Sequence, residues 1–198
     1  MSVPTDGAEA RFLFRRRRRI SEAELELNNL MRLLWEQHTA WTRMTINASV
    51  FGTPDQQAVT ARLLRNPTNF ARALEPLYGR AIASEFERLL RDHLVIAAEL
   101  VTAAKAGDTQ AAADAEVRWY QNADQIAALL GRINPFWSEA EWRAMLHEHL
   151  RNVKGEAVAL LNSQFELSTR VYDEAERQAL MMADELTRGI VRQFPRKF

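Results

Sequence analysis

Three histidines occupy the apolar faces of three separate predicted helices, at His38, His93 and His149. A helical core normally excludes titratable side chains unless a partner binds them. Neutral imidazole is the commonest protein ligand for transition metals, and carboxylates from facing helices complete such sites inside helical bundles. Glu156 lies two turns after His149 on the same face, and Asp124 lies at the edge of a neighbouring core face. The pattern predicts a core site for Fe, Mn or Zn with His38, His93, His149, Glu156 and Asp124 as ligands or as partners of the ligands.

The spacing around these histidines also gives a reason against a metal. Di-iron carboxylate bundles use Glu-x-x-His, which places two ligands one turn apart on the same helix. In this chain the residues three positions before the histidines are Trp35, Leu90 and Leu146. No histidine on a core face therefore has a carboxylate one turn before it.

Two other interpretations of the same residues stay open. The first is a non-enzymatic structural or interaction module, in which a buried hydrogen-bonded network fixes the register of the helices and an arginine-rich arm contacts an anionic partner. The candidate members of the network, besides the histidines, are Glu156, Asp124, Asn122, Thr42 and Tyr120. The second is a small-molecule pocket with an apolar wall and a few polar groups. Its candidate lining residues are Trp41, Trp119, Tyr120, Trp142 and Arg43.

Motifs that mark common enzyme classes are missing from the sequence. There is no cysteine, which excludes thiolate metal sites, iron–sulfur clusters, disulfides and cysteine nucleophiles. The sequence contains no Walker loop, no Rossmann glycine motif, no G-x-S-x-G and no H-E-x-x-H. No nucleotide cofactor is predicted, and no residue stands out as a nucleophile.

Helix signals recur along the chain, and glycine and proline are scarce. Capping boxes at Ser21-Glu-Ala-Glu24 and Ser138-Glu-Ala-Glu141 open two long helices, and Gly107-Asp108 joins two more in a tight antiparallel pair. The periodicity predicts long helices over about 21–50, 81–106, 109–130 and 138–162, with a last one that ends near 193. Residues 52–79 are predicted to form an accessory helical crossover. The expected fold is all-α, a four-helix-type bundle with ferritin-like or hemerythrin-like architecture.

Charge divides the chain into an arm and a body. Residues 1–20 hold six of the 26 basic side chains and two of the 26 acidic ones, which leaves 20 basic and 24 acidic on the remainder. We predict a flexible arm over 1–20 whose Arg15–Arg19 run contacts an anionic partner or a membrane surface, and one helical domain over 21–198. The acidic body argues against specific nucleic-acid binding. No apolar run is long enough to span a bilayer, so we expect a cytoplasmic protein that could form a homo-oligomer.

Several segments of the chain are distinctive as strings, namely Leu34-Trp-Glu-Gln-His38, Trp41-Thr-Arg-Met-Thr-Ile46, Arg62-Leu-Leu-Arg-Asn-Pro67, Ala103-Ala-Lys-Ala-Gly-Asp108, Trp119-Tyr-Gln-Asn-Ala-Asp124, Ile133-Asn-Pro135 and Gln193-Phe-Pro195. They resemble an uncharacterised family of small helical bacterial proteins from spore-forming Firmicutes. The resemblance covers about residues 22–198 and implies a helical fold but no catalytic residue. Some members of that family are labelled acetylglutamate kinase. Such a kinase needs an α/β sandwich with glycine-rich phosphate loops, and the seven scattered glycines here contradict that label.

Overall fold

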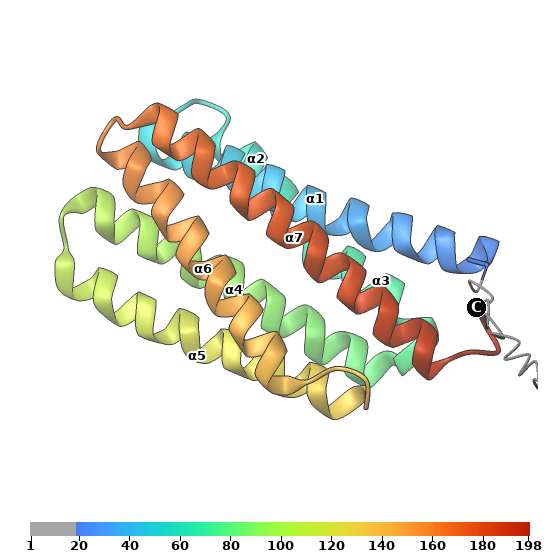
Figure 1. The fold of residues 1–198 in the computed structure, drawn as a ribbon. Helices are drawn as coiled ribbons and strands as arrows, with labels where there is room; N and C mark the ends of the chain where they lie inside the picture. The colour runs from blue at the N-terminus through green and yellow to red at the C-terminus, as the bar shows by residue number, and fades with distance from the viewer. Residues whose placement is uncertain (1–18) are drawn as a thin grey trace, which may run out of the picture.

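The computed structural model describes residues 19–198, and all regular structure within them is α-helix (Figure 1). The helices are α1 (Glu22–Phe51), α2 (Gln56–Leu63), α3 (Asn66–Tyr78), α4 (Arg80–Ala106), α5 (Thr109–Ile133), α6 (Glu139–Leu161) and α7 (Phe165–Gln193). The two predicted capping serines are confirmed, because Ser21 Oγ accepts from the backbone N–H of Glu24 and Ser138 Oγ accepts from that of Glu141. Most of the Arg15–Arg19 run lies outside the described residues.

The helices form a bundle in which α1 packs against several of the others. Around the bundle, α1 packs against α7, α7 against α6, α6 against α5, α5 against α4, α4 against α3, and α2 returns to α1. In Figure 1 α1, α4 and α6 run in one direction, and α5 and α7 run in the other. None of these helices combines the length and hydrophobicity that crossing a bilayer requires.

The segment predicted as an accessory crossover is helical and packs along the bundle. Asn66-Pro67 does end α2, but Pro67 falls in the first turn of α3, where proline costs no hydrogen bond. The chain therefore continues along the bundle, and Phe70, Ala71 and Leu74 are buried on α3 as it packs against α4. Together α2 and α3 form one broken helix. The prediction of an all-α bundle with a helical segment over residues 52–79 is confirmed, and this segment contributes buried residues to the core.

The bundle consists of three similar helical pairs: α1 with α2–α3, α4 with α5, and α6 with α7. The turn inside each pair contains a left-handed residue, namely Gly52 (φ 66°), Gly107 (φ 73°) and Ser163 (φ 57°), which lie 55 and 56 residues apart. Buried residues recur at the same spacing in the second helix of each pair, at Phe70, Ile126 and Met182 and at Leu74, Leu130 and Leu186. The fold is therefore a threefold structural repeat.

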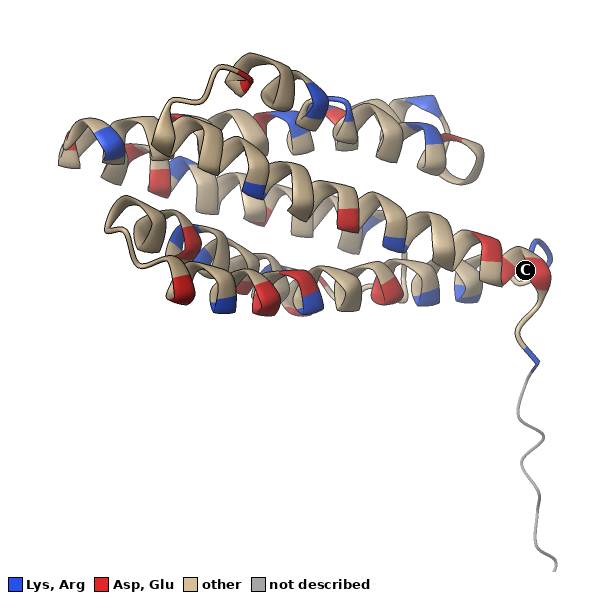
Figure 2. Cartoon of the chain, turned by 90° about the horizontal axis from the view of Figure 1, so that it is seen from above, with Lys and Arg blue, Asp and Glu red and all other residues tan. Residues whose placement is uncertain are grey.

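Acidic and basic residues are interspersed along the helices, as Figure 2 shows from a second direction. Exposed ion pairs such as Arg118–Glu99 and Arg132–Glu85, at 2.7 and 2.6 Å, connect α5 with α4. Pairs of this kind contribute about 0–1 kcal/mol each. The packed apolar interior, rather than the surface charge, holds the helices together.

Candidate functional site: a histidine layer and an apolar chamber

The three predicted core histidines meet in one layer across the bundle. His38 on α1, His93 on α4 and His149 on α6 are each 2–3% exposed. The ring centroids of His38 and His149 lie 5.5 Å apart, and those of His93 and His149 lie 6.4 Å apart. All three rings line the same narrow cavity in the centre of the bundle, and we call them the histidine layer. The structure thus brings together residues that periodicity alone could only assign to separate core faces.

A side-chain amide from the second helix of the pair holds the first histidine. Asn66 Oδ1 lies 3.1 Å from His38 Nδ1, and Asn66 Nδ2 donates to the backbone carbonyl of Leu34 at 2.9 Å. The second bond fixes which end of the amide faces the ring, since only the NH2 group can donate to a carbonyl. His38 must therefore carry its proton on Nδ1 and donate it to Asn66. Its Nε2 is left as an acceptor.

The same arrangement recurs in the other two pairs, with one difference. Asn122 Oδ1 lies 2.9 Å from His93 Nδ1, and Asn122 Nδ2 donates to the carbonyl of Leu89 at 3.0 Å. In the third pair the longer Gln178 donates to the carbonyl of Met145 and lies beside His149. Its Oε1 and the ring Nδ1 do not reach hydrogen-bond geometry, and both are buried without a partner in the described part of the chain. The amides Asn66, Asn122 and Gln178 are spaced like the histidines, although the sequence alone indicated only Asn122 as a partner.

Burial keeps the histidine layer uncharged at neutral pH. Loss of water lowers the pKa of His38 to about 4, which the hydrogen bond that His38 donates to Asn66 opposes only in part. Burial and the nearby His38 lower the pKa of His93 to about 3. The pKa of His149 falls well below its usual value because of burial first and then the two neighbouring rings. Three neutral imidazoles can share the core because none of them carries a charge that would repel the others.

The two carboxylates predicted as metal ligands do not join the histidine layer. Glu156 is buried, and its Oε1 accepts from Arg43 Nη1 at 2.7 Å. Burial raises the pKa of Glu156 to about 7 against the opposing charge of Arg43. Asp124 is 45% exposed and pairs with Arg143 and His147 on the outer surface, at 3.2 and 2.8 Å. Within residues 19–198, no group of three or more histidine or acidic side chains is arranged to hold a metal ion.

Similarity to other proteins gives no further assignment. The chain matches no family model, no curated protein and no solved structure. Its chemistry has to be deduced from the arrangement of its own residues.

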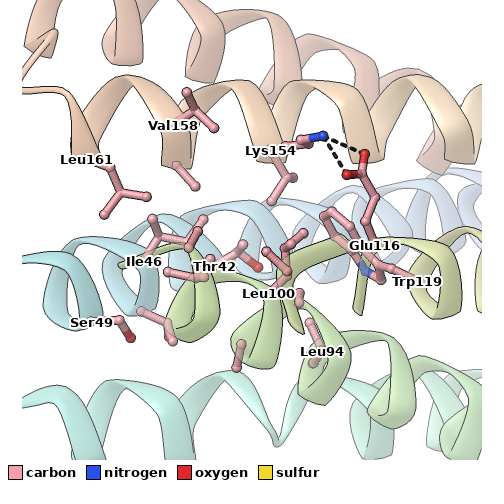
Figure 3. Close-up of a pocket in the computed structure, with 18 of the residues that line it drawn as sticks. Thr42, Ile46, Ser49, Leu94, Leu100, Glu116, Trp119, Lys154, Val158 and Leu161 are labelled. Atoms are coloured by element: carbon pink, nitrogen blue, oxygen red, sulfur yellow. Dashed lines mark hydrogen bonds and ion pairs between the residues drawn. The ribbon is translucent and has the colours of Figure 1, made fainter. Parts of the chain in front are cut away.

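An apolar chamber of about 390 Å³ lies directly beyond the histidine layer. The residues four positions after the three histidines, Thr42, Ala97 and Val153, all line it, so it begins one helical turn past the rings. Its walls come from α1, α4, α5 and α6, as Figure 3 shows. Most of the lining side chains are aliphatic, and alanine occurs repeatedly among them, at positions 97, 98, 104, 112, 113 and 157. Because the helices present small side chains to one another here, a space remains between them. Elsewhere in the core, larger side chains fill the space between the helices.

Three polar atoms of the chamber's lining residues have no hydrogen-bond partner in the described part of the chain. They are the hydroxyl oxygens of Thr42 and Thr45 and the indole nitrogen of Trp119. These residues are 8%, 7% and 2% exposed. A buried polar group without a partner costs about 1–3 kcal/mol. The indole nitrogens of Trp35 and Trp142, which do not line the chamber, are likewise buried without a partner among the described residues. Trp119 also packs against His93, with 5.3 Å between ring centroids, and so connects the chamber to the histidine layer.

Charged residues occur only near the rim of the chamber. Lys154 on α6 holds both carboxylate oxygens of Glu116 on α5 at 2.6 Å (Figure 3). Asp108 accepts from the backbone N–H of Ala111 and caps α5. The interior of the chamber is therefore neutral, and the one cation among its described lining residues is already paired.

Of the five residues predicted to line a pocket, only Trp119 lines the chamber. Trp142 lies against the histidine layer instead, and the guanidinium of Arg62 covers Trp41. Aromatic residues were the wrong signal, because large rings fill space. The useful signal was the recurrence of alanine on facing helices, at half-buried positions such as Ala97, Ala98 and Ala112.

Proposed function

We propose that this protein binds a small apolar molecule in the chamber, and that the histidine layer is the rigid floor of that site. The observation that carries the proposal is the chamber itself, a concave space of about 390 Å³ with mostly aliphatic walls. Ligand sites in helical bundles have this composition and this range of volume.

The histidine layer supports the proposal because it fixes the geometry of the floor. His38 and His93 are each held by a side-chain amide. Each amide also donates to a backbone carbonyl one turn earlier on the helix that carries the histidine. Such a network restricts both the ring orientation and the register of neighbouring helices. Because the rings and the helix register are fixed, neighbouring side chains cannot shift to fill the chamber.

A neutral, environment-sensitive fluorophore tests the binding function directly. N-phenyl-1-naphthylamine emits weakly in water and strongly in apolar surroundings. Titration into the protein should give a saturable rise in emission with one site per chain. Ala157→Phe, which places a ring inside the chamber, should abolish most of that rise.

Ala140→Phe provides the matched control on the same helix. Ala140 is exposed on α6 outside the chamber, whereas Ala157 is 6% exposed and lines it. Equal binding by wild type, Ala157→Phe and Ala140→Phe would place the fluorophore elsewhere and refute the proposal. So would a lack of saturable binding to the wild type.

A transition metal is a second candidate ligand, in a bundle of ferritin-like or hemerythrin-like architecture. One observation favours it: His38 and His93 donate from Nδ1 to amides, as metal-bound histidines donate to their outer partners, and this frees Nε2. The placement of Glu156 and Asp124 argues against it. Elemental analysis of protein incubated with Fe, Mn and Zn distinguishes the two. Equal metal content in wild type and in His93→Ala/His149→Ala would remove the metal candidate.

The basic arm and the cellular context stay predictions from the sequence. We propose that Arg15–Arg19 contacts an anionic partner or membrane surface, in the cytoplasm of a bacterial cell, and that the protein could self-associate. Deletion of residues 1–20 should then weaken binding to anionic vesicles in a salt-dependent manner. Unchanged binding would show that the arm plays no part in it.

A further inference from the structure

The polar atoms and charges around the chamber narrow the class of ligand, provided that the proposed binding function holds. We infer that the ligand is a neutral apolar molecule with a hydrogen-bond-accepting oxygen, such as a ketone, ester or alcohol. Trp119 and the hydroxyls of Thr42 and Thr45 recognise that oxygen.

The donor character of the three unpartnered groups points to an acceptor. An indole N–H can donate but cannot accept, so the only partner that satisfies Trp119 is an acceptor. The two threonine hydroxyls can donate as well, and neither bonds back to its own helix, unlike Thr39, which donates to the carbonyl of Glu36 at 3.0 Å. All three residues line one chamber. A single oxygen with two lone pairs can accept from two of these donors.

The charges around the chamber exclude ionised ligands as the preferred class. Lys154 is the one basic residue of the described lining, and Glu116 already binds it. A carboxylate or phosphate would have to enter an aliphatic space without a free cation, which is costly. An ammonium ligand would meet the indole N–H as a second donor. A neutral oxygen avoids both penalties.

The position of Trp119 is set by the histidine layer rather than by the chamber. Its ring packs against that of His93, which Asn122 holds in turn. The donor is therefore fixed before a ligand arrives. Such preorganisation reduces the entropy lost on binding.

Two ligands that differ in a single group test the inference. Benzophenone and diphenylmethane have nearly the same shape, but only the ketone has an acceptor oxygen. Indole N–H resonances in ¹H–¹⁵N spectra report the contact, and Trp119→Phe identifies the resonance of Trp119. We expect benzophenone to move that proton downfield and diphenylmethane to leave it nearly unchanged.

Thr42→Val/Thr45→Val provides the matched variant, because valine keeps the shape of threonine without its hydroxyl. The ratio of benzophenone affinity to diphenylmethane affinity should fall about three- to tenfold in this variant, the scale of one hydrogen bond. The anion 4-benzoylbenzoate should bind wild type at least about tenfold more weakly than benzophenone, because no free cation receives its charge.

The outcomes separate this inference from the binding function itself. If the fluorophore fails to bind, the proposed function is wrong. If the fluorophore binds and Ala157→Phe blocks it, the function stands. In that case, an unmoved Trp119 resonance with an unchanged affinity ratio, or anion binding equal to that of the ketone, overturns the neutral-acceptor class.

Discussion

Acid should destabilise this protein through the histidine layer. His38 and His93 have folded-state pKa values of about 4 and about 3, against about 6.5 in the unfolded chain, and burial also lowers the pKa of His149 well below that value. The unfolded state therefore takes up more protons, so stability is fully present above about pH 6.5 and is lost as the pH falls from there towards the folded-state pKa values. At pH 5, which is about 1.5 units below the unfolded-state pKa, His38 and His93 should each have cost the folded state about 2 kcal/mol at 1.36 kcal/mol per unit. These two rings give about 4 kcal/mol, a large part of the stability of many domains, and His149 adds a loss of the same sign.

Urea denaturation at pH 7.5 and pH 5 measures this loss. His93→Gln should reduce the difference in unfolding free energy between the two pH values by about 2 kcal/mol relative to wild type. Burial raises the pKa of Glu156 to about 7, so this group stabilises the fold as the pH falls, with the opposite sign. Its contribution is common to both proteins and cancels in the comparison. His147→Gln is the control, because His147 pairs with Asp124 outside the histidine layer and this substitution leaves the three buried rings in place. If His93→Gln shows the same pH dependence as wild type, the ring of His93 is not buried in its neutral form.

Three further substitutions test particular contacts. Gly189→Ala should lower the free energy of unfolding by about 1–3 kcal/mol, because the new Cβ would overlap the indole of Trp137; chemical denaturation measures it. Ser163→Gly should raise the thermal midpoint and stabilise by about 1 kcal/mol, since a serine there bears the cost of a left-handed backbone at φ 57°; a lower midpoint contradicts this. Asn122→Leu should cost about 2–4 kcal/mol in urea, because it strands the ring nitrogen of His93 and the carbonyl that Asn122 binds. A loss below about 1 kcal/mol, the scale of one ordinary hydrogen bond, would show that the amide does not hold the layer.

The helices themselves were predictable because their signals are local. A capping serine such as Ser21 and a terminating glycine such as Gly107 act within one turn, so neither depends on tertiary structure. The place of α2 and α3 in the bundle was not predictable in the same way. Asn66-Pro67 predicts the end of a helix. Only the packing of Phe70 and Leu74 shows that the chain continues along the bundle after it.

The histidine layer was predictable as a set of core residues but not as a site. Helical periodicity assigned His38, His93 and His149 to apolar faces, but it cannot fix the order of helices around a bundle. His93 and His149 lie 56 residues apart and Gly52 and Gly107 lie 55 apart, so the threefold repeat has a signal in the sequence. The chamber depends on what small side chains leave unfilled, and periodicity carries no information about empty volume.

The most direct test of the chamber is a crystal structure of the protein under xenon pressure. Xenon enters apolar cavities that are accessible from solvent and large enough to hold it. We predict xenon between Ala97 and Ala157, beyond the histidine layer, and no xenon there in Ala157→Phe. A wild-type crystal in which the side chains close the chamber and xenon is absent from it would contradict the proposed binding site.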